Sequence, residues 1–442
     1  MKTKRNRILL ALAVGLAYTA SGLVADESSR GDWLWSTAHV IPKHTTNEGS
    51  GYFSIVEGRN GRIYIGTAKY GENAYLVEFD PTTDEMKVVV DAHKEIGTDA
   101  TGFAAQAKFH TRNNVGKSGR VYIGTKQGYP KRGEPRLAYP GGYPMVYDPA
   151  TGKTRVYRIP IPHHGISSVT PDESRNVAYV STCSDERHPT ESSYFLQLNL
   201  TTGKYRTFLD CEHMYPFIVV DWLGRAYHPI LGGDIARFDP STDRLERLAQ
   251  TIDGKLPTAE SLLADPLSHP ISWELSPDRK TLYAVAMNSN ALYAYNLTES
   301  TDEIVGRTVC KLISNAQKVD CRAMCVAPDG TVWAGIAATF ENRGLLLTVA
   351  SYEPKSGESR YHGPIAVRNR DFTKFQAADG SALPFHGGFH KVDGHLVPHG
   401  VILGICAAKD GTVYVTTLAP LTVHAFSAEE LRKSTTVQSK NN

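Results

Sequence analysis

A turn followed by a short alternating strand recurs along this chain, and the repeat constrains the fold more than any other sequence feature. Each copy opens with the Asn, Asp or Gly chemistry of a tight hairpin, after which β-branched and aromatic residues alternate with a period of two. Successive copies start about fifty to sixty residues apart, and the last interval is about eighty. The copies are NGRIYIGT (60–67), SGRVYIGT (118–125), RNVAYVST (175–182), LGRAYHP (223–229), DRKTLYAV (278–285), DGTVWAGI (329–336) and DGTVYVTT (410–417).

Further strands surround each copy. An apolar segment precedes each turn, and a second strand follows that mostly ends in an Asp-Pro or Asn-Leu-Thr turn before a polar outer strand. The second strands are AYLVEFDPTT (74–83), PMVYDPATG (144–152), YFLQLNLTTG (194–203), DIARFDPSTD (234–243), ALYAYNLTES (291–300), TVASYEPKSG (348–357) and TVHAFSAEE (422–430). Four strands per repeat at this period predict an all-β fold, a seven-bladed β-propeller with four-stranded antiparallel blades.

The repeat also predicts the domain limits. We expect the propeller to span residues 33–432, with the segment around Ala38–Pro42 completing the last blade, and residues 433–442 to form a disordered tail. An eighth copy of the turn and strand is absent from the sequence, and a β-sandwich would not repeat at this period. Helix signals are nearly absent, so residues 259–264 and 428–433 are expected to form short turns at most.

The N-terminus has the three-part order of a secretory signal peptide. Lys2, Lys4, Arg5 and Arg7 precede an apolar run over 8–20, and small residues follow it. We predict cleavage between about residues 22 and 25, so that residues 1–25 are the signal peptide, rather than retention as a membrane anchor. No other run is long enough to span a bilayer. The sequence therefore predicts a secreted or periplasmic protein without a membrane span.

The composition limits the classes of binding partner that the chain can have. A net charge of +2 without basic runs argues against nucleic acid as the main partner. Among the six cysteines, Cys325 and Cys406 occupy the same position of successive repeats, where we expect them to pack between blades as small hydrophobic residues. The sequence leaves room for one disulfide among the other four, Cys183, Cys211, Cys310 and Cys321.

Basic and titratable residues recur where the innermost strands are expected to begin. In a propeller these positions share one rim of the central channel with the loops that leave the repeated strand, and function concentrates on that rim. A single histidine there is more often a hydrogen-bonded cap on a strand end, but many converging on one axis indicate a site for an acidic ligand. In blade order, the rim residues are Lys69 and Tyr70; His110, Arg112, Lys126, Gln127 and Tyr129; His163 and His164; His213, Tyr215 and His228; His269, Asn288 and Asn290; Asp320 and Arg322; His395 and His399.

A histidine-rich segment, PFHGGFHKVDGHLVPHG, lies before the last repeat. His386, His390, His395 and His399 are weak candidate metal ligands, because no carboxylate stands at a fixed spacing from them. The alternative is a loop with one or two channel-facing histidines. A divalent ion (Mn, Ca or Zn) is left open as a cofactor.

Motifs for other chemistries are missing. The sequence contains no GxSxG, Walker loop, HExxH or DxDxDG element, and paired carboxylates of the glycosidase kind are not evident at the rim. The acidic residues mostly fall in outer turns. This distribution favours chemistry performed by His, Tyr and Arg over hydrolysis by carboxylates.

The sevenfold repeat with histidines at the innermost strands resembles the seven-bladed propeller polysaccharide lyases of the oligogalacturonate-lyase and ulvan-lyase type. HPISWELSPDRKTLYAV (269–285) looks like an oligogalacturonate-lyase repeat, and DGTVW (329–333) looks like the repeats of streptogramin-lyase propellers. The likeness covers most of the chain at the level of blade organisation. The Gln/His metal cluster of the oligogalacturonate group has no clean match here.

The resemblance implies β-elimination from a uronic acid residue of an acidic polysaccharide or oligosaccharide. A cation must neutralise the carboxylate, a base takes the C5 proton, and an acid protonates the leaving oxygen. On this reading Arg322 or Arg112 binds the carboxylate, His110 or His164 is the base, and Tyr215 with His213 is the acid. Substrate-binding residues would be His163, His228, His269, His399, Lys126 and Tyr129.

Two other function classes remain open from the sequence. One is a non-catalytic propeller that binds a glycan or a protein through the same rim. The other is a small-molecule enzyme of the streptogramin-lyase or lactonase-like propeller class. Formation of an unsaturated uronate, or tight binding without it, separates the lyase from the binding protein.

Overall fold

The structure is a computed structural model that describes residues 32–46, 53–184, 191–213, 215–256, 272–299, 302–369, 388–418, 420–434 and 436–437. The signal peptide predicted at 1–25, the turn predicted at 259–264, His269 and His386 lie outside these residues, as does most of the predicted tail.

The described strands pair in groups of four antiparallel neighbours that follow the sequence repeat. In chain order the groups are β2 (Ile55–Glu57), β3 (Ile63–Gly66), β4 (Tyr75–Asp80) and β5 (Glu85–Asp91); β6 (Lys108–Phe109) with β7 (Asn114–Val115), β8 (Val121–Lys126), β9 (Pro144–Asp148) and β10 (Lys153–Val156); β11 (Gly165–Asp172), β12 (Val177–Cys183), β13 (Glu191–Asn199) and β14 (Tyr205–His213); β15 (Val219–Val220), β16 (Ala226–Pro229), β17 (Ile235–Asp239) and β18 (Arg244–Ile252); β19 (Ser272–Leu275), β20 (Thr281–Val285), β21 (Ala291–Asn296) and β22 (Glu303–Lys311); β23 (Lys318–Val326), β24 (Val332–Phe340), β25 (Gly344–Glu353) and β26 (Glu358–Val367); and β29 (Gly404–Ala407), β30 (Val413–Thr417), β31 (Thr422–Phe426) and β1 (Leu34–Val40).

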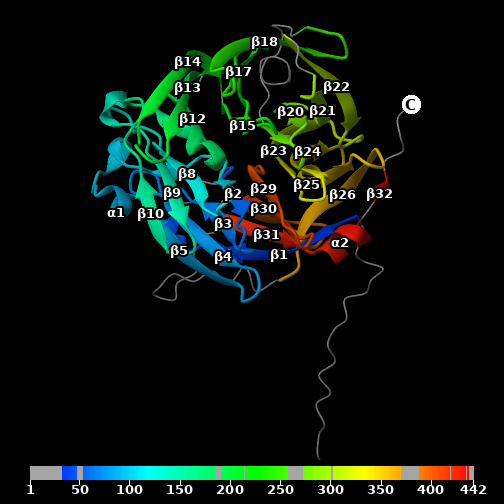
Figure 1. The fold of residues 1–442 in the computed structure, drawn as a ribbon. Coiled ribbons are helices and arrows are strands. Elements are labelled where there is room, and N and C mark those ends of the chain that lie inside the picture. Colours follow the sequence, from blue (N-terminus) through cyan, green and yellow to red (C-terminus); the bar gives the residue numbers. More distant parts are fainter. Residues whose placement is uncertain are drawn as a thin grey trace, which may run out of the picture. The chain divides into compact units, whose positions relative to one another are not determined.

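These groups lie around a common centre, with β2, β15, β23 and β29 nearest to it and β5, β14, β18 and β22 at the periphery (Figure 1). This confirms the predicted all-β fold with four-stranded antiparallel sheets. Parallel pairs β1–β26 and β18–β22 join some groups into larger sheets, so the number of seven blades stays a prediction. Elsewhere β27 (Phe389–Val392) and β28 (His395–Pro398) form a hairpin, and β32 (Thr436–Val437) pairs with β26.

The N-terminal strand closes the last group, as the sequence predicts. Residues Thr37–Val40 of β1 pair antiparallel with Thr422–Ala425 of β31, while Leu34–Ser36 pair parallel with Ile365–Val367 of β26. One strand therefore fastens the two ends of the described chain together.

Helices are short. α2 (Ala428–Lys433) begins at Ser427, whose hydroxyl accepts a hydrogen bond from the Glu430 N–H, so it is a capped helix where the sequence predicted a turn at most. Sequence patterns also missed α1 (Ala92–Ile96), which is capped by the Asp91 carboxylate and ends at Gly97. Single 3-10 turns lie at η2 (Lys43–Thr45), η3 (Gly102–Ala104), η4 (Arg136–Ala138) and η5 (Glu173–Arg175).

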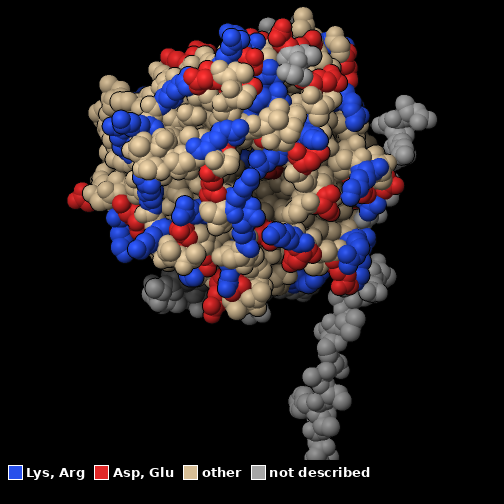
Figure 2. Space-filling model, in the orientation of Figure 1, with Lys and Arg blue, Asp and Glu red and all other residues tan. Residues whose placement is uncertain are grey.

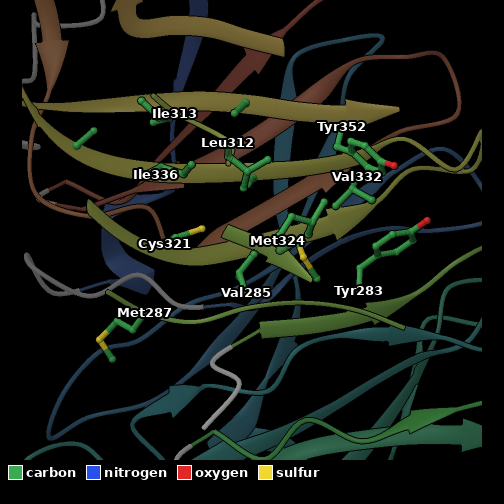
Figure 3. Packing of buried hydrophobic residues seen from close by; sticks show 14 of the residues in the cluster. Tyr283, Val285, Met287, Leu312, Ile313, Cys321, Met324, Val332, Ile336 and Tyr352 are labelled. Carbon is green, nitrogen blue, oxygen red and sulfur yellow. The ribbon is translucent and has the colours of Figure 1, made fainter. Parts of the chain in front are cut away.

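The core is distributed between neighbouring sheets. Figure 3 shows one such layer, in which Tyr283 and Val285 of β20 lie near Met324 of β23 and Val332 of β24. The strands of the recurring turn-and-strand motif are covered on both faces, and every residue of β3 and β8 is buried. In outer strands such as β5, exposed residues alternate with partly buried ones instead.

The glycine inside the repeated strand has a packing reason. A Cβ at Gly124 would lie 2.4 Å from Cγ2 of Ile166, which belongs to the innermost strand of the next group. At Gly335 the corresponding distance to Ile402 Cγ2 would be 2.5 Å. Only glycine lets adjacent groups approach this closely.

The cysteines pack as hydrophobic residues. Cys325 and Cys406 are each 7% exposed and belong to the layers between β23, β29 and β2, as predicted. All six cysteines are free thiols, so the disulfide considered among Cys183, Cys211, Cys310 and Cys321 does not form. These four lie in separate strands, and Cys211, Cys310 and Cys321 have hydrophobic neighbours.

Buried neutral histidines should make stability depend on pH. Burial lowers the pKa of His228 and His362 to about 4 and that of His424 to about 3, whereas each returns to its ordinary value of 6.5 on unfolding. The unfolded chain then binds more protons below pH 6.5, so the free energy of unfolding should fall by about 1.4 kcal/mol per histidine from pH 7.5 to 5.5. Urea denaturation at both pH values measures this, and unchanged midpoints would contradict it. Replacing His228 by Phe should remove the contribution of this one histidine to the pH dependence of the free energy of unfolding.

Every innermost strand leads into a turn of the repeat, so the channel has two different ends. We call the end at which these strands begin the strand-start mouth and the other end the turn mouth. Phe53, His110 and Tyr215 precede or begin innermost strands, whereas Glu57 and Val326 end them. Residues at the two mouths can therefore be assigned from their place in the strand.

Candidate functional site

A bulge in the second group carries the residues at the centre of the candidate site. β6 pairs Lys108 and Phe109 with Lys126 and Thr125, whereas β7 resumes pairing of Asn114 with Tyr122. The four residues 110–113 therefore lie opposite only two, 123 and 124. Thr111 Oγ1 accepts the Gly124 N–H at 3.1 Å, which replaces a ladder bond that the bulge removes. Bulges commonly re-aim side chains at functional sites.

His110 is directed from this bulge into an aromatic environment. Its side chain is 2% exposed and stacks on Tyr215, with ring centroids 5.2 Å apart and an interplanar angle of 13°. Phe53, from the first group, lies 5.6 Å from the His110 ring and 5.1 Å from that of Tyr215. Residues before three innermost strands thus meet at the strand-start mouth.

Two buried lysines lie beside His110. Lys108 and Lys126 are each 1% exposed and are direct partners across β6 and β8. Burial, together with the charges of Lys126 and Lys108, holds the pKa of His110 well below its ordinary value. His110 is therefore a neutral imidazole at pH 7, able to accept a proton, in a positive electrostatic environment.

Tyrosine rings surround the lysines. The Lys108 Nζ lies 4.5 Å from the Tyr129 ring centroid and 5.6 Å from that of Tyr70, and these two rings are 4.9 Å apart. The Lys126 Nζ lies 6.0 Å from the Tyr215 ring. Tyr129 is 43% exposed, so this group of cations and rings extends from the interior to solvent.

His164 adjoins the same group. Its Nδ1 lies 3.1 Å from Thr182 Oγ1, and its ring meets that of Tyr194 edge-on. Burial lowers the pKa of His164 to about 4; Asp210 opposes this shift, and His163 and Lys126 add to it. The neighbouring His163 is exposed, with Nδ1 2.7 Å from the Tyr139 carbonyl oxygen.

Arg322 lies at the site, but its guanidinium is already paired with the carboxylate of Asp320. Its Nε and one terminal nitrogen each donate to Asp320 at 2.7 Å. Burial opposes its charging, but Asp320, with a smaller contribution from Tyr215, raises the pKa of Arg322. A substrate carboxylate would have to compete with Asp320, so the buried lysines are better placed than Arg322 for the predicted carboxylate binding.

Two predicted site residues lie elsewhere. Arg112 crosses towards β19 and β23 and lines cavities at the turn mouth, so it does not face the strand-start mouth. His228 is fully buried between the third and fourth groups, stacked on Phe195 of β13 with its Nδ1 2.8 Å from the Pro229 carbonyl oxygen. His213, also fully buried, ends β14 two residues before Tyr215. Sequence position alone did not distinguish side chains that face the channel from those between sheets.

The described histidines of the histidine-rich segment do not lie together. The rings of His390 and His399 lie 4.9 Å apart, whereas His395 packs edge-on against Trp33 and Trp35. Within the described ranges no group of three or more His, Cys, Asp or Glu side chains could hold a metal ion. The proposed ligands His390, His395 and His399 are therefore not assembled as a set.

Lys108 and Phe53 were missed from the sequence. Lys108 precedes His110 by two residues, and side chains at that spacing share one face of a strand, so the period of two could have revealed it. Phe53 gave no comparable signal, because its contacts with His110 and Tyr215 depend on how three groups meet across the ring.

No family model and no curated protein matches this chain. Among solved structures, one described as streptogramin B lyase is 14% identical, with a TM-score of 0.50 over 88% of this chain and 97% of that chain. The Cps50 (Swd1) β-propeller domain of Myceliophteria thermophila is 11% identical, with a TM-score of 0.50 over 86% of this chain and 96% of that chain. The fold is a β-propeller.

A third structure is the extracellular domain of a hybrid two-component system from B. thetaiotaomicron, 11% identical over 89% of this chain and 41% of that chain, with a TM-score of 0.48. At these identities the likenesses show the fold alone. Across the described part of the propeller, no helix is long and apolar enough to cross a membrane.

Proposed function

We propose that this propeller is an exported carbon–oxygen lyase that cleaves uronic-acid-containing glycans by β-elimination at the strand-start mouth. The observation that carries the proposal is the neutral His110, stacked on Tyr215 and flanked by the buried cations Lys108 and Lys126. Such a site combines a proton acceptor, a hydroxyl donor and positive charge for a carboxylate.

The reaction follows from these groups. The lysine charges stabilise the substrate carboxylate as negative charge develops on it, which acidifies the neighbouring C5–H bond. His110 takes the C5 proton, and the electron pair of that bond forms the C4–C5 double bond as the C4–O bond breaks. The Tyr215 hydroxyl protonates the departing glycosidic oxygen. Return of the His110 proton through solvent to Tyr215 restores both groups.

Lysine rather than Arg322 is assigned to the carboxylate. Lys108 and Lys126 act on His110 electrostatically, which places their charges near the reacting proton. Tyr129 and Tyr70 present rings beside Lys108, and exposed aromatic faces suit the apolar faces of neighbouring sugars. The structural likeness to a protein described as streptogramin B lyase supports the proposal to this extent, that a propeller scaffold can carry a lyase.

Ultraviolet absorbance of the unsaturated uronate tests the activity directly. The purified protein is incubated with a panel of uronate polymers and with neutral glucans as controls, and we expect absorbance to rise with at least one uronate polymer only. Calorimetric titration of the same panel identifies the alternative. Tight binding of a uronate polymer without absorbance would replace the lyase by a glycan-binding propeller.

Tyr215→Phe tests the assignment of the acid. This change keeps the ring that stacks on His110 and removes the hydroxyl, so we expect kcat to fall by about 10²–10⁴-fold with little change in KM. Tyr205→Phe, which removes a hydroxyl bonded to the Arg158 carbonyl oxygen on an outer strand, is the matched control. Wild-type kcat in Tyr215→Phe would remove Tyr215 from the mechanism.

A further inference from the structure

We propose that Arg112 is a positioning residue, a brace across the channel that fixes the bulge bearing His110. The kinetic part of this inference rests on the proposed function, whereas its structural part does not.

The contacts of Arg112 span the ring. One terminal nitrogen donates to the Trp273 carbonyl oxygen, and the other donates to the Glu274 carboxylate and, at 2.9 Å, to the Met324 carbonyl oxygen. Arg112 belongs to the second group, Trp273 and Glu274 to β19 of the fifth, and Met324 to β23 of the sixth. One side chain therefore ties three innermost segments that are distant in sequence.

The acceptor end of the brace is itself held in place. Glu274 Oε2 also accepts the Val326 N–H at 3.1 Å, so the carboxylate joins β19 to β23. Trp273, next to it, is 2% exposed and donates its indole N–H to the Phe217 carbonyl oxygen at 2.6 Å. Arg112 thus anchors the bulge to a rigid part of the ring.

The bulge depends on side chains for its shape. Regular pairing with β8 stops over 110–113, and the gap is bridged instead by Thr111 and Asn113. Asn113 Oδ1 accepts the Ser54 hydroxyl at 2.7 Å, and Asn114 Nδ2 donates to the Arg112 and Val169 carbonyl oxygens. These bonds hold the bulge to its neighbours, and Arg112 adds the tie to the far side of the channel.

Arg112 faces the opposite mouth from His110. It lines a cavity of about 370 Å³ with Glu57, Arg59, Glu274 and Lys409, and an adjoining one of about 320 Å³ that includes Arg279. Figure 2 shows Lys and Arg side chains beside the central hollow of the face in view. A residue at the turn mouth can affect chemistry at the strand-start mouth only through the bulge, which defines its role as positioning.

Arg112→Ala tests the brace by chemical rescue. Loss of the guanidinium should lower kcat by about 10²-fold with KM nearly unchanged, because small displacements of a base are costly. Millimolar ethylguanidine, which can enter the turn-mouth cavity, should restore part of the lost kcat. Arg279→Ala, which removes a guanidinium from the same cavity wall but no bond across the channel, is the matched control.

A second readout does not need activity. The imidazole NMR signals of His110, assigned by their absence in His110→Asn, should broaden or split in Arg112→Ala and in Glu274→Gln but not in Arg279→Ala. Glu274→Gln serves if Arg112→Ala does not fold. Unchanged His110 signals in a folded Arg112 or Glu274 variant would overturn the brace, including where stability alone has fallen. If the His110 signals are perturbed in these variants but the wild-type protein has no lyase activity, the brace is supported and the proposed function is wrong.

Discussion

His110→Ala should lower kcat/KM for formation of the unsaturated uronate by about 10²–10⁴-fold, the usual contribution of a positioned general base. The imidazole is the only described group that is both neutral at pH 7 through burial and flanked by the Lys108 and Lys126 charges while stacked on Tyr215. Initial rates from product absorbance measure the effect. His44→Ala, at an exposed position of the turn Lys43–Thr45, is the control and should retain the wild-type rate.

The pH profile adds an independent check. Because the pKa of His110 lies well below 6.5, this base should stay unprotonated as the pH falls from 8 to 6, and the wild-type rate should not show a histidine titration in that range. A rate that falls with a pKa near 6.5 would assign the base to a more exposed histidine. Wild-type activity in His110→Ala would contradict the assignment outright.

Asp221→Ala should be the most destabilising single change that we expect in the scaffold, lowering the free energy of unfolding by about 3–5 kcal/mol. The fully buried carboxylate accepts the Leu223 and Arg225 N–H groups, the Arg225 Nε at 2.6 Å and the Tyr227 hydroxyl at 2.9 Å. Its loss leaves the Arg225 guanidinium, which is 3% exposed, without its counter-charge. Denaturant unfolding followed by tryptophan fluorescence measures the change.

An equivalent turn offers the matched control. Asp329 lies in the exposed turn of the sixth group, where its carboxylate accepts the Thr331 N–H at 2.8 Å, so Asp329→Ala should cost only about 0.5–1.5 kcal/mol. The double change of Asp221→Leu with Arg225→Met should recover part of the loss, since it removes both buried charges. Equal losses for the Asp221 and Asp329 variants would show that the buried network contributes no more than one turn bond.

Local patterns were sufficient for the scaffold. The recurring turn and alternating strand predicted the fold class and the four-stranded groups, because each group depends on residues close together in the chain. The closing role of the segment at Ala38–Pro42 followed instead from the strand that the last repeat lacks, although its partner β31 lies at the other end of the chain. The short helices were harder to predict from the sequence. α1 depends on the Asp91 cap and on Gly97, and five residues give too little periodicity to be recognised.

The candidate site was only partly accessible from sequence. The sequence placed His110, His164, Tyr215 and Arg322 at the starts of innermost strands and Lys126 in the second rim loop of its blade. In the structure His110 stacks on Tyr215, and Lys126 acts on both His110 and His164. The bulge could not be anticipated, because it is set by Gly124, Thr111 and Asn113 acting together, and it sends Arg112 to the opposite mouth. The pairing of Arg322 with Asp320 likewise depends on geometry that spacing does not report.

The strand that joins both ends of the ring sets the timing of assembly. β1 is synthesised first, but its partners β26 and β31 are synthesised last, and the Trp35 N–H bonds to Glu430 across a separation of 395 residues. At ordinary rates of translation, tens of seconds pass between these events. Until then both edges of the unfinished ring stay open to solvent and to other chains, so deleting either β1 or β31 should produce the same aggregation-prone intermediate.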